Sequence, residues 1–213
     1  FFGPIIYYIM FTIVTSKSKI ITCQKRLVKK KTNNNLIFPS ELSDIWFTNG
    51  KEPVMDKPRL LYVGRIKVEK GIFSLIKILD NLNYDLSLSI AGKDETKKIN
   101  SKKINFLGFQ KDFSSLIKIY DDHNITILPS FTEAHPKVID ESLARIRPVI
   151  IFEEINHIIQ NRQGIFVCKR NSESLLKTLK FIMENYKDIQ EKIKKNKLPK
   201  KDNFISDLVK ILD

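Results

Sequence analysis

Two acidic residues, Glu133 and Glu141, stand eight positions apart in one segment of the sequence. Glu133 comes shortly after the apolar run at 124–128, and Glu141 lies in the second turn of a helix that we expect to contain Pro136 in its first turn. Because a helix turns by about 100° per residue, Glu141 points away from the apolar stripe of that helix. We expect both carboxylates to reach one crevice, where they would accept hydrogen bonds from sugar hydroxyls. For either acid alone, a solvated side chain is the alternative.

Two basic residues, Arg65 and Lys70, lie five positions apart just before another expected helix. Gly64, which ends the apolar run 60–63, precedes them. A forked guanidinium, an ammonium group and the free N–H groups of a helix N-terminus together suit a diphosphate. The segment 64–71 matches neither the GxGxxG fingerprint nor the phosphate loop that ends in Gly-Lys-Ser/Thr. Solvated loop side chains are the competing interpretation of this pair.

Short apolar runs alternate with amphipathic segments from residue 59 onward. We expect helices to begin near residues 72, 113, 136 and 172, and strands at 60–63, 86–91, 104–107, 124–128, 148–152 and 165–167. This order predicts an α/β fold with a doubly wound, mostly parallel sheet. Ligands bind at the carboxyl ends of such strands, so we expect the basic pair and the acidic pair to face one crevice there.

We expect the chain to divide into three regions. The polar, proline-containing stretch at 48–57 is typical of a linker, which places a boundary near residue 50 between residues 1–50 and an α/β domain at 51–190. Residues 191–213 form a basic, helical tail. The apolar segment 1–14 is too short to cross a bilayer and is expected to be a buried helix, with the end of a membrane anchor as the alternative.

Composition narrows the possible partners and compartment. The chain has 213 residues, of which 42% are hydrophobic, so a folded domain is expected. Its two cysteines, Cys23 and Cys168, have no CxxC partner, which argues against a disulfide framework or a zinc site and favours a reducing cytoplasm. A net charge of +13 suits nucleic acid or an anionic membrane, although lysine is abundant throughout the chain.

These motifs, taken in order, resemble the family 4 retaining glycosyltransferases of GT-B fold. Glu133 and Glu141 have the E-x7-E spacing of that family, and other segments follow its order over about residues 58–185. These segments are Leu61-Tyr62-Val63-Gly64-Arg65, Glu69-Lys70-Gly71, Ile90-Ala91-Gly92, Phe106-Leu107-Gly108, Ile127-Leu128-Pro129-Ser130, Pro148-Val149-Ile150 and Gly164-Ile165-Phe166-Val167. The resemblance implies a carboxy-terminal, Rossmann-like domain that binds a nucleotide-diphosphate sugar.

The resemblance also implies roles for single residues. Arg65 and Lys70 would hold the donor diphosphate and stabilise it as it leaves, Glu133 would hold the transferred sugar, and Glu141 the ribose hydroxyls. Such enzymes need no metal and no side-chain nucleophile, since catalysis is largely electrostatic. The other implied contacts are the backbone at Gly64, the backbone near Phe109 against the base, backbone N–H groups around Lys137 and Val138 against sugar or phosphate, and His135 beside the sugar.

The sequence departs from the family pattern at several places. Ala134-His135-Pro136 replaces a Gly-Phe-Gly-like segment, and Arg145-Ile146-Arg147 replaces a glycine before the Pro-Val pair. The identity of the donor sugar therefore stays open, and so does the question of whether His135 contacts it. Residues 1–50 are interpreted as a remnant of the family's amino-terminal acceptor domain and its linker. We accordingly expect these 213 residues to bind nucleotide without transferring the sugar.

Two other classes of function remain open. A glycoside hydrolase would also use two carboxylates, but the alternating topology and the basic pair favour a sugar-nucleotide enzyme. A non-catalytic basic module would bind nucleic acid or anionic membrane in a salt-sensitive way; of these two, nucleic acid is not the expected partner. The family's acceptors are often lipid-linked, so the lysines of the tail would contact an anionic leaflet. The alternative is that the tail is a solvated helix. These lysines are Lys192, Lys194, Lys195, Lys197, Lys200 and Lys201.

Overall fold

The computed structural model describes residues 10, 12–13, 20–22, 34–36, 42–48, 50, 52–93 and 103–212. The chain divides into two compact units: Asp44–Leu198, and Phe1–Ser43 together with Pro199–Asp213. The apolar helix expected at 1–14 lies largely outside the described residues.

The larger unit is built around a parallel sheet of six strands in the order β5-β4-β3-β6-β7-β8. Every pairing within it is parallel. The strands are β3 (Arg59–Val63), β4 (Ser87–Ala91), β5 (Ile104–Gly108), β6 (Ile125–Leu128), β7 (Val149–Phe152) and β8 (Ile165–Cys168). The first strand, β3, lies in the middle of the sheet. Strands β4 and β5 extend the sheet to one edge, and β6, β7 and β8 extend it to the other, which confirms the predicted doubly wound fold.

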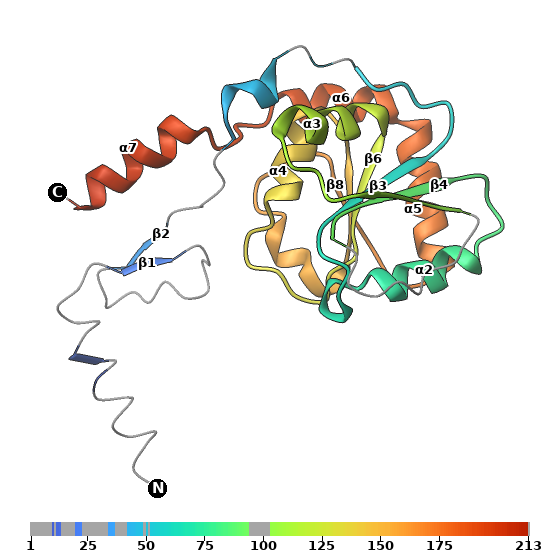
Figure 1. Cartoon of the computed structure of the whole chain (residues 1–213), viewed down its shortest axis with the longest axis horizontal. Coiled ribbons are helices and arrows are strands. Elements are labelled where there is room, and N and C mark those ends of the chain that lie inside the picture. Colours follow the sequence, from blue (N-terminus) through green and yellow to red (C-terminus); the bar gives the residue numbers. More distant parts are fainter. Residues whose placement is uncertain are drawn as a thin grey trace, which may run out of the picture. The chain divides into compact units, whose positions relative to one another are not determined.

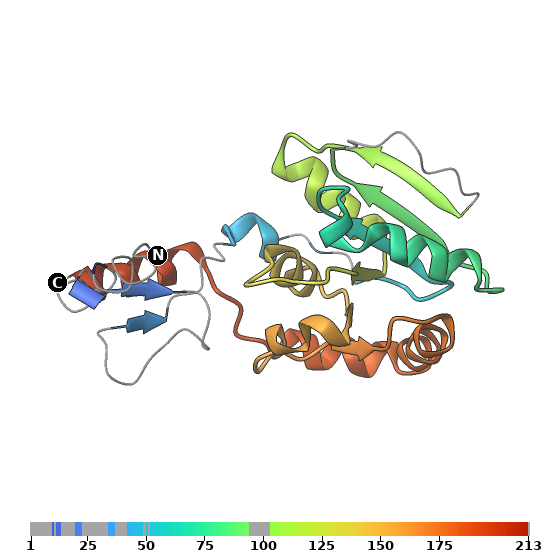
Figure 2. The same cartoon turned by 90° about the horizontal axis from the view of Figure 1, so that it is seen from below.

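Helices cover both faces of this sheet. Helices α3 (Phe113–Asp122) and α4 (Lys137–Ala144) lie on one face, whereas α2 (Ile72–Asp80) and α5 (Ser172–Glu184) lie on the other (Figures 1 and 2). Asp112 and Asn171 cap α3 and α5 by accepting hydrogen bonds from the backbone N–H groups of Ser115 and Ser174. Pro136 caps α4 rather than lying within its first turn, so this helix begins one residue later than expected.

Shorter elements complete the unit. The 3₁₀ helices are η2 (Asp44–Phe47), η3 (Val68–Lys70) and η4 (Glu153–Ile158), and α6 (Tyr186–Lys194) follows α5. The sequence did not predict η2, which buries Trp46 to 2% exposure.

Strands β6 and β7 lie entirely within the core. All four residues of β6 and of β7 are buried, because helices cover both faces of the sheet. Each helix adds an apolar stripe at helical spacing, such as Leu75 and Leu79 from α2 and Leu175 and Leu179 from α5. The packing of these helices against the sheet therefore holds the carboxyl ends of the strands in place.

Among its described residues, the smaller unit has a strand pair and the helix α7. Strand β1 (Ile20–Thr22) pairs in parallel with β2 (Asn34–Leu36), and α7 covers Lys201–Leu212. The backbone of Leu42 accepts a hydrogen bond from Lys201 N–H and donates one to the Pro199 carbonyl. Of the helices that the structure describes, none has the length and apolar character to cross a membrane.

Candidate functional site

Two loops at the carboxyl edge of the sheet meet at Gly71. The backbone of Gly71 has a φ of +68°, and a Cβ atom there would lie 1.8 Å from the carbonyl oxygen of Pro129. Only glycine fits such a close approach in this conformation. Next to it, the N–H of Phe131 donates to the carbonyl of Glu69 at 3.0 Å. The loop after β3 and the loop after β6 are therefore held together through their backbones.

This contact brings Lys70 and Glu133 together. The Lys70 ammonium lies 2.6 Å from Glu133 Oε1, and their side chains are only 22% and 11% exposed. The hydroxyl of Ser130 donates to the same oxygen at 2.7 Å. Nε2 of His157 lies 2.9 Å from the Glu133 carbonyl. One member of each predicted pair thus lies in a single polar cluster.

Arg170, which follows β8, holds the loop after β6 in place. Its guanidinium donates to the carbonyls of Pro129 at 2.9 Å and Ser130 at 3.3 Å. It lies 4.1 Å from the ring centre of Phe131 and 4.3 Å from that of Phe152, so it is sandwiched between two aromatic rings. Sequence analysis missed Arg170, because nothing in its own segment marks it.

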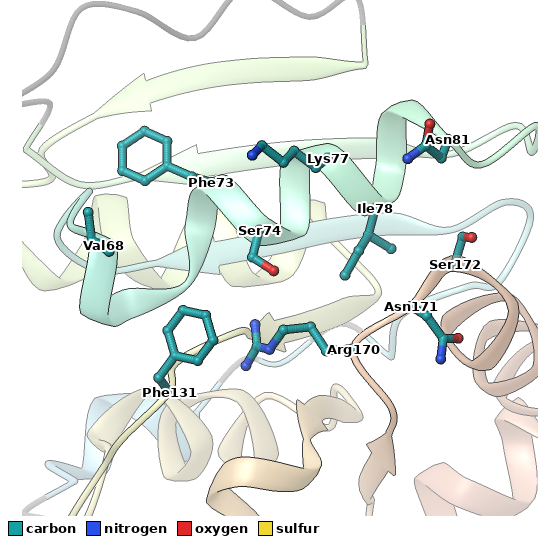
Figure 3. Close-up of a pocket in the computed structure, with 10 residues that line it drawn as sticks. All are labelled: Val68, Phe73, Ser74, Lys77, Ile78, Asn81, Phe131, Arg170, Asn171 and Ser172. Carbon is teal, nitrogen blue, oxygen red and sulfur yellow. The ribbon is translucent and has the colours of Figure 1, made fainter.

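A cavity of about 490 Å³ adjoins these loops on the face covered by α2. Figure 3 shows Phe131 and Arg170 below α2, with Phe73 and Lys77 projecting from that helix and Asn171 at the start of α5. The cavity combines aromatic and polar walls, and it lies beside the residues that hold Lys70 and Glu133 in place.

Glu141 has a separate partner on the other face of the sheet. The hydroxyl of Tyr120, at the end of α3, donates to Glu141 Oε2 at 2.8 Å. Burial raises the pKa of Glu141 above its ordinary value, although the bond from Tyr120 and the charge of Lys137 oppose this effect. Burial also raises the pKa of Tyr120, with the Glu141 charge adding to the rise. Tyr120 therefore stays a neutral donor.

The remaining predicted residues lie around the same edge. Arg65 is exposed, and its carbonyl accepts a hydrogen bond from the Tyr62 hydroxyl at 2.7 Å. Phe109 follows β5 and is 68% exposed, while Lys137 and Val138 form the first turn of α4. Within the described part of the chain, neither Arg65 nor Glu141 bonds directly to Lys70 or Glu133.

The side chain of His135, in the loop before α4, is buried beside charged groups. Its Nε2 lies 3.1 Å from Oδ2 of Asp140, a carboxylate that is fully buried in α4. Arg162 donates to the other oxygen of Asp140 at 2.7 Å. This network fixes the start of α4, four residues beyond Glu133.

The two arginines that depart from the family pattern are both buried. Arg145 forms two hydrogen bonds with Asp121, at 2.9 and 2.6 Å, and Arg147 lies 3.2 Å from the same carboxylate. Burial lowers the pKa of Arg147 to about 10, an effect that the charge of Asp121 opposes. Arg145 also donates to the carbonyls of Trp46 and Thr48 at 3.1 and 2.8 Å, which ties η2 to the domain.

No three His, Cys, Asp or Glu side chains in the described residues form a group that could hold a metal ion.

Comparison with known proteins identifies a family for the larger unit. Residues 44–198 match the family described as "Glycosyl transferases group 1". These are the residues of the unit Asp44–Leu198. An "uncharacterized glycosyltransferase" of Haemophilus influenzae is 24% identical over 215 residues, which cover 92% of this chain. The chain spans only 60% of the length of that relative.

Solved structures share the same fold. Sucrose-phosphate synthase from Thermosynechococcus elongatus superposes with a TM-score of 0.71 at 18% identity, over 96% of this chain and 60% of that one. Anabaena Alr3699/HepE, in complex with UDP and glucose, superposes with a TM-score of 0.74 at 12% identity, over 96% of this chain and 66% of that one.

Proposed function

Since the chain belongs to the glycosyl transferases of group 1, we propose that Asp44–Leu198 is the donor domain of a family 4-like, retaining enzyme of GT-B fold. The enzyme would transfer a sugar from a nucleoside-diphosphate sugar to a sugar or lipid-linked acceptor. Anabaena Alr3699/HepE has been solved with UDP-glucose, which supports a donor of this chemical class.

The observation that carries this proposal is the meeting of Lys70 and Glu133. Two motifs 63 residues apart in sequence converge to a 2.6 Å contact at the carboxyl edge of a parallel sheet. Ligands bind at that edge in open α/β sheets. A cation and a carboxylate held by backbone contacts offer one partner for a diphosphate and one for sugar hydroxyls.

Donor binding would rearrange this ion pair. The diphosphate would compete with Glu133 for the Lys70 ammonium, and Arg65, whose side chain is exposed in the same loop, would add a second cation. The released Glu133 carboxylate would then accept hydrogen bonds from the transferred sugar. The two cations would stabilise the negative charge that develops on the leaving diphosphate.

The other proposed contacts surround the nucleotide. Glu141 would bind the ribose hydroxyls, and backbone near Phe109 would meet the base. The N–H groups of Lys137 and Val138 at the start of α4 would bind sugar or phosphate, because a helix N-terminus favours anions. Gly64 would let the ligand approach the backbone, and His135 would lie beside the sugar. We propose that transfer requires no metal ion.

Calorimetry with a matched pair of variants tests this function. Titrations would use UDP, ADP and GDP, with Lys70→Met compared with Lys118→Met. Lys118 makes an equally short ion pair, 2.6 Å to Asp122, but that pair is exposed on α3. We expect at least one nucleoside diphosphate to bind, with Lys70→Met weakening it by about tenfold to a hundredfold and Lys118→Met leaving it unchanged.

Two results would contradict the proposal. One is equal affinity for the diphosphate in both variants. The other is salt-sensitive binding to DNA or to anionic vesicles with no response to any nucleoside diphosphate, which would support the basic-module alternative.

A further inference from the structure

The contact between Tyr120 and Glu141 joins α3 to α4, the next helix along the chain after β6. Tyr120 ends in a hydroxyl that donates to Glu141 Oε2 at 2.8 Å, across 21 residues of sequence. Tyr120 is fully buried, so the donor is shielded from water. A tyrosine inside an apolar core usually needs one partner for its hydroxyl, and here that partner is the carboxylate that we assign to the ribose.

The tyrosine ring itself is held in place by its surroundings. Trp46, which is 2% exposed, packs edge-on against it with ring centres 5.5 Å apart. The next residue, Asp121, is held by Arg145, which also binds the backbone of η2. The position of the hydroxyl is therefore set by packing on one side and by an ion pair on the other.

We propose that Tyr120 is a positioning residue, which fixes the Glu141 carboxylate so that the site recognises the ribose hydroxyls of the nucleotide. This inference rests on the proposed function of Glu141. A carboxylate has about four lone-pair positions, and the bond from Tyr120 uses one of them on Oε2. Oε1 and the remaining position on Oε2 stay available to two neighbouring hydroxyl groups.

The alternative is that the bond serves stability alone, as a satisfied buried hydroxyl. Tyr186 provides the comparison, because it is also buried and its hydroxyl donates to the backbone carbonyl of Asn124 at 2.6 Å. Tyr120→Phe and Tyr186→Phe remove the same atom from buried rings. Only Tyr120→Phe should change how the protein distinguishes a ribose from a sugar without hydroxyls.

The main test measures binding of a nucleoside diphosphate and of its 2′,3′-dideoxy analogue by calorimetry, using the best binder among UDP, ADP and GDP. We expect the wild type to prefer the ribonucleotide, and Tyr120→Phe to weaken ribonucleotide binding by about fivefold to tenfold. Dideoxynucleotide binding should not change. Tyr186→Phe should keep the wild-type preference, and a thermal melt confirms that each variant is folded.

A pH series provides a readout that a purely structural role would leave unchanged. The groups that act on the Glu141 charge are Tyr120 from α3 and Lys137 and Asp140 from α4. Protonated Glu141 is a poorer acceptor, so ribonucleotide affinity falls as the pH drops through its pKa. Tyr120 lowers that pKa, and its removal should move this fall in affinity to a higher pH. Dideoxynucleotide binding should show no such shift.

The outcomes distinguish failure of this inference from failure of the proposed function. If the wild type binds no nucleoside diphosphate, the proposed function fails and the inference fails with it. If the wild type binds both nucleotides equally, or if folded Tyr120→Phe keeps the wild-type preference and pH profile, nucleotide binding stands and the inference is overturned. Should Tyr120→Phe not fold, 3-fluorotyrosine at position 120 keeps the ring and strengthens the donor, and an unchanged pH profile would again overturn it.

Discussion

Gly71 occupies the position on which the proposed donor site depends most directly. It combines a φ of +68° with a contact so close that a Cβ would lie 1.8 Å from the Pro129 carbonyl oxygen. Gly108 has nearly the same φ, +69°, but a Cβ there would meet no atom within 4 Å. These two glycines therefore separate the cost of the backbone conformation from the cost of the close approach.

We predict that Gly108→Ala lowers the free energy of unfolding by about 1 kcal/mol, which is the cost of left-handed backbone for a residue with a Cβ. Gly71→Ala should lower it by about 3 kcal/mol, because the two loops must also move apart. It should weaken nucleoside diphosphate binding as well, since Lys70 and Glu133 would separate. Urea unfolding measures the first effect and calorimetry the second. Equal losses of stability in the two variants would show that the loops do not meet at Gly71.

At the scale of elements, the buried guanidinium of Arg145 ties η2 to the domain. Arg145 is 1% exposed and donates both to Asp121 and to the carbonyls of Trp46 and Thr48. Trp46 is the only tryptophan of the chain, so its fluorescence reports on this attachment.

We predict that Arg145→Ala shifts the emission of Trp46 to longer wavelength, because η2 detaches and the indole meets water. The free energy of unfolding should fall by about 2 kcal/mol, less than is usual for a broken buried pair, since Arg147 still faces Asp121. Arg65→Ala, which removes an exposed arginine, serves as the control and should leave the emission unchanged. An unshifted spectrum in Arg145→Ala would contradict this account of η2.

The sequence was informative where local pattern determines structure. The six strands of the larger unit and helices α2, α3, α4 and α5 follow from apolar runs and helical spacing, and the order of strand and helix predicted the doubly wound sheet. The meeting of Lys70 with Glu133 could be anticipated, because both residues follow strands whose carboxyl ends share one edge.

Other contacts could not be predicted, because they depend on which distant elements become neighbours. Arg170 reaches Pro129 and Ser130 across about 40 residues, and its own segment carries no motif. Tyr120 lies in a helix that its apolar spacing predicts, but that spacing does not indicate Glu141 of α4 as the partner of its hydroxyl. Arg145 and Arg147 appeared only as departures from a pattern, whereas the structure shows them as a buried ion-pair cluster.

For the whole molecule, the larger unit and the family match cover the same residues, 44–198. The chain spans 60% of the length of its Haemophilus influenzae relative, so an acceptor site, and any contact with an anionic membrane, are proposals about the complete protein. The donor site, in contrast, is assigned to residues within this unit. Our central claim is that this domain alone binds a nucleoside diphosphate at the carboxyl edge of the sheet.

A crystal structure of the chain with a bound nucleoside diphosphate tests that claim most directly. We predict that the Lys70 ammonium leaves Glu133 and contacts the diphosphate, while the ribose hydroxyls lie within hydrogen-bonding distance of Glu141 and the base lies near Phe109. A nucleotide bound at another face of the domain, with the Lys70–Glu133 ion pair intact and Glu141 out of reach of the ribose, would contradict the account.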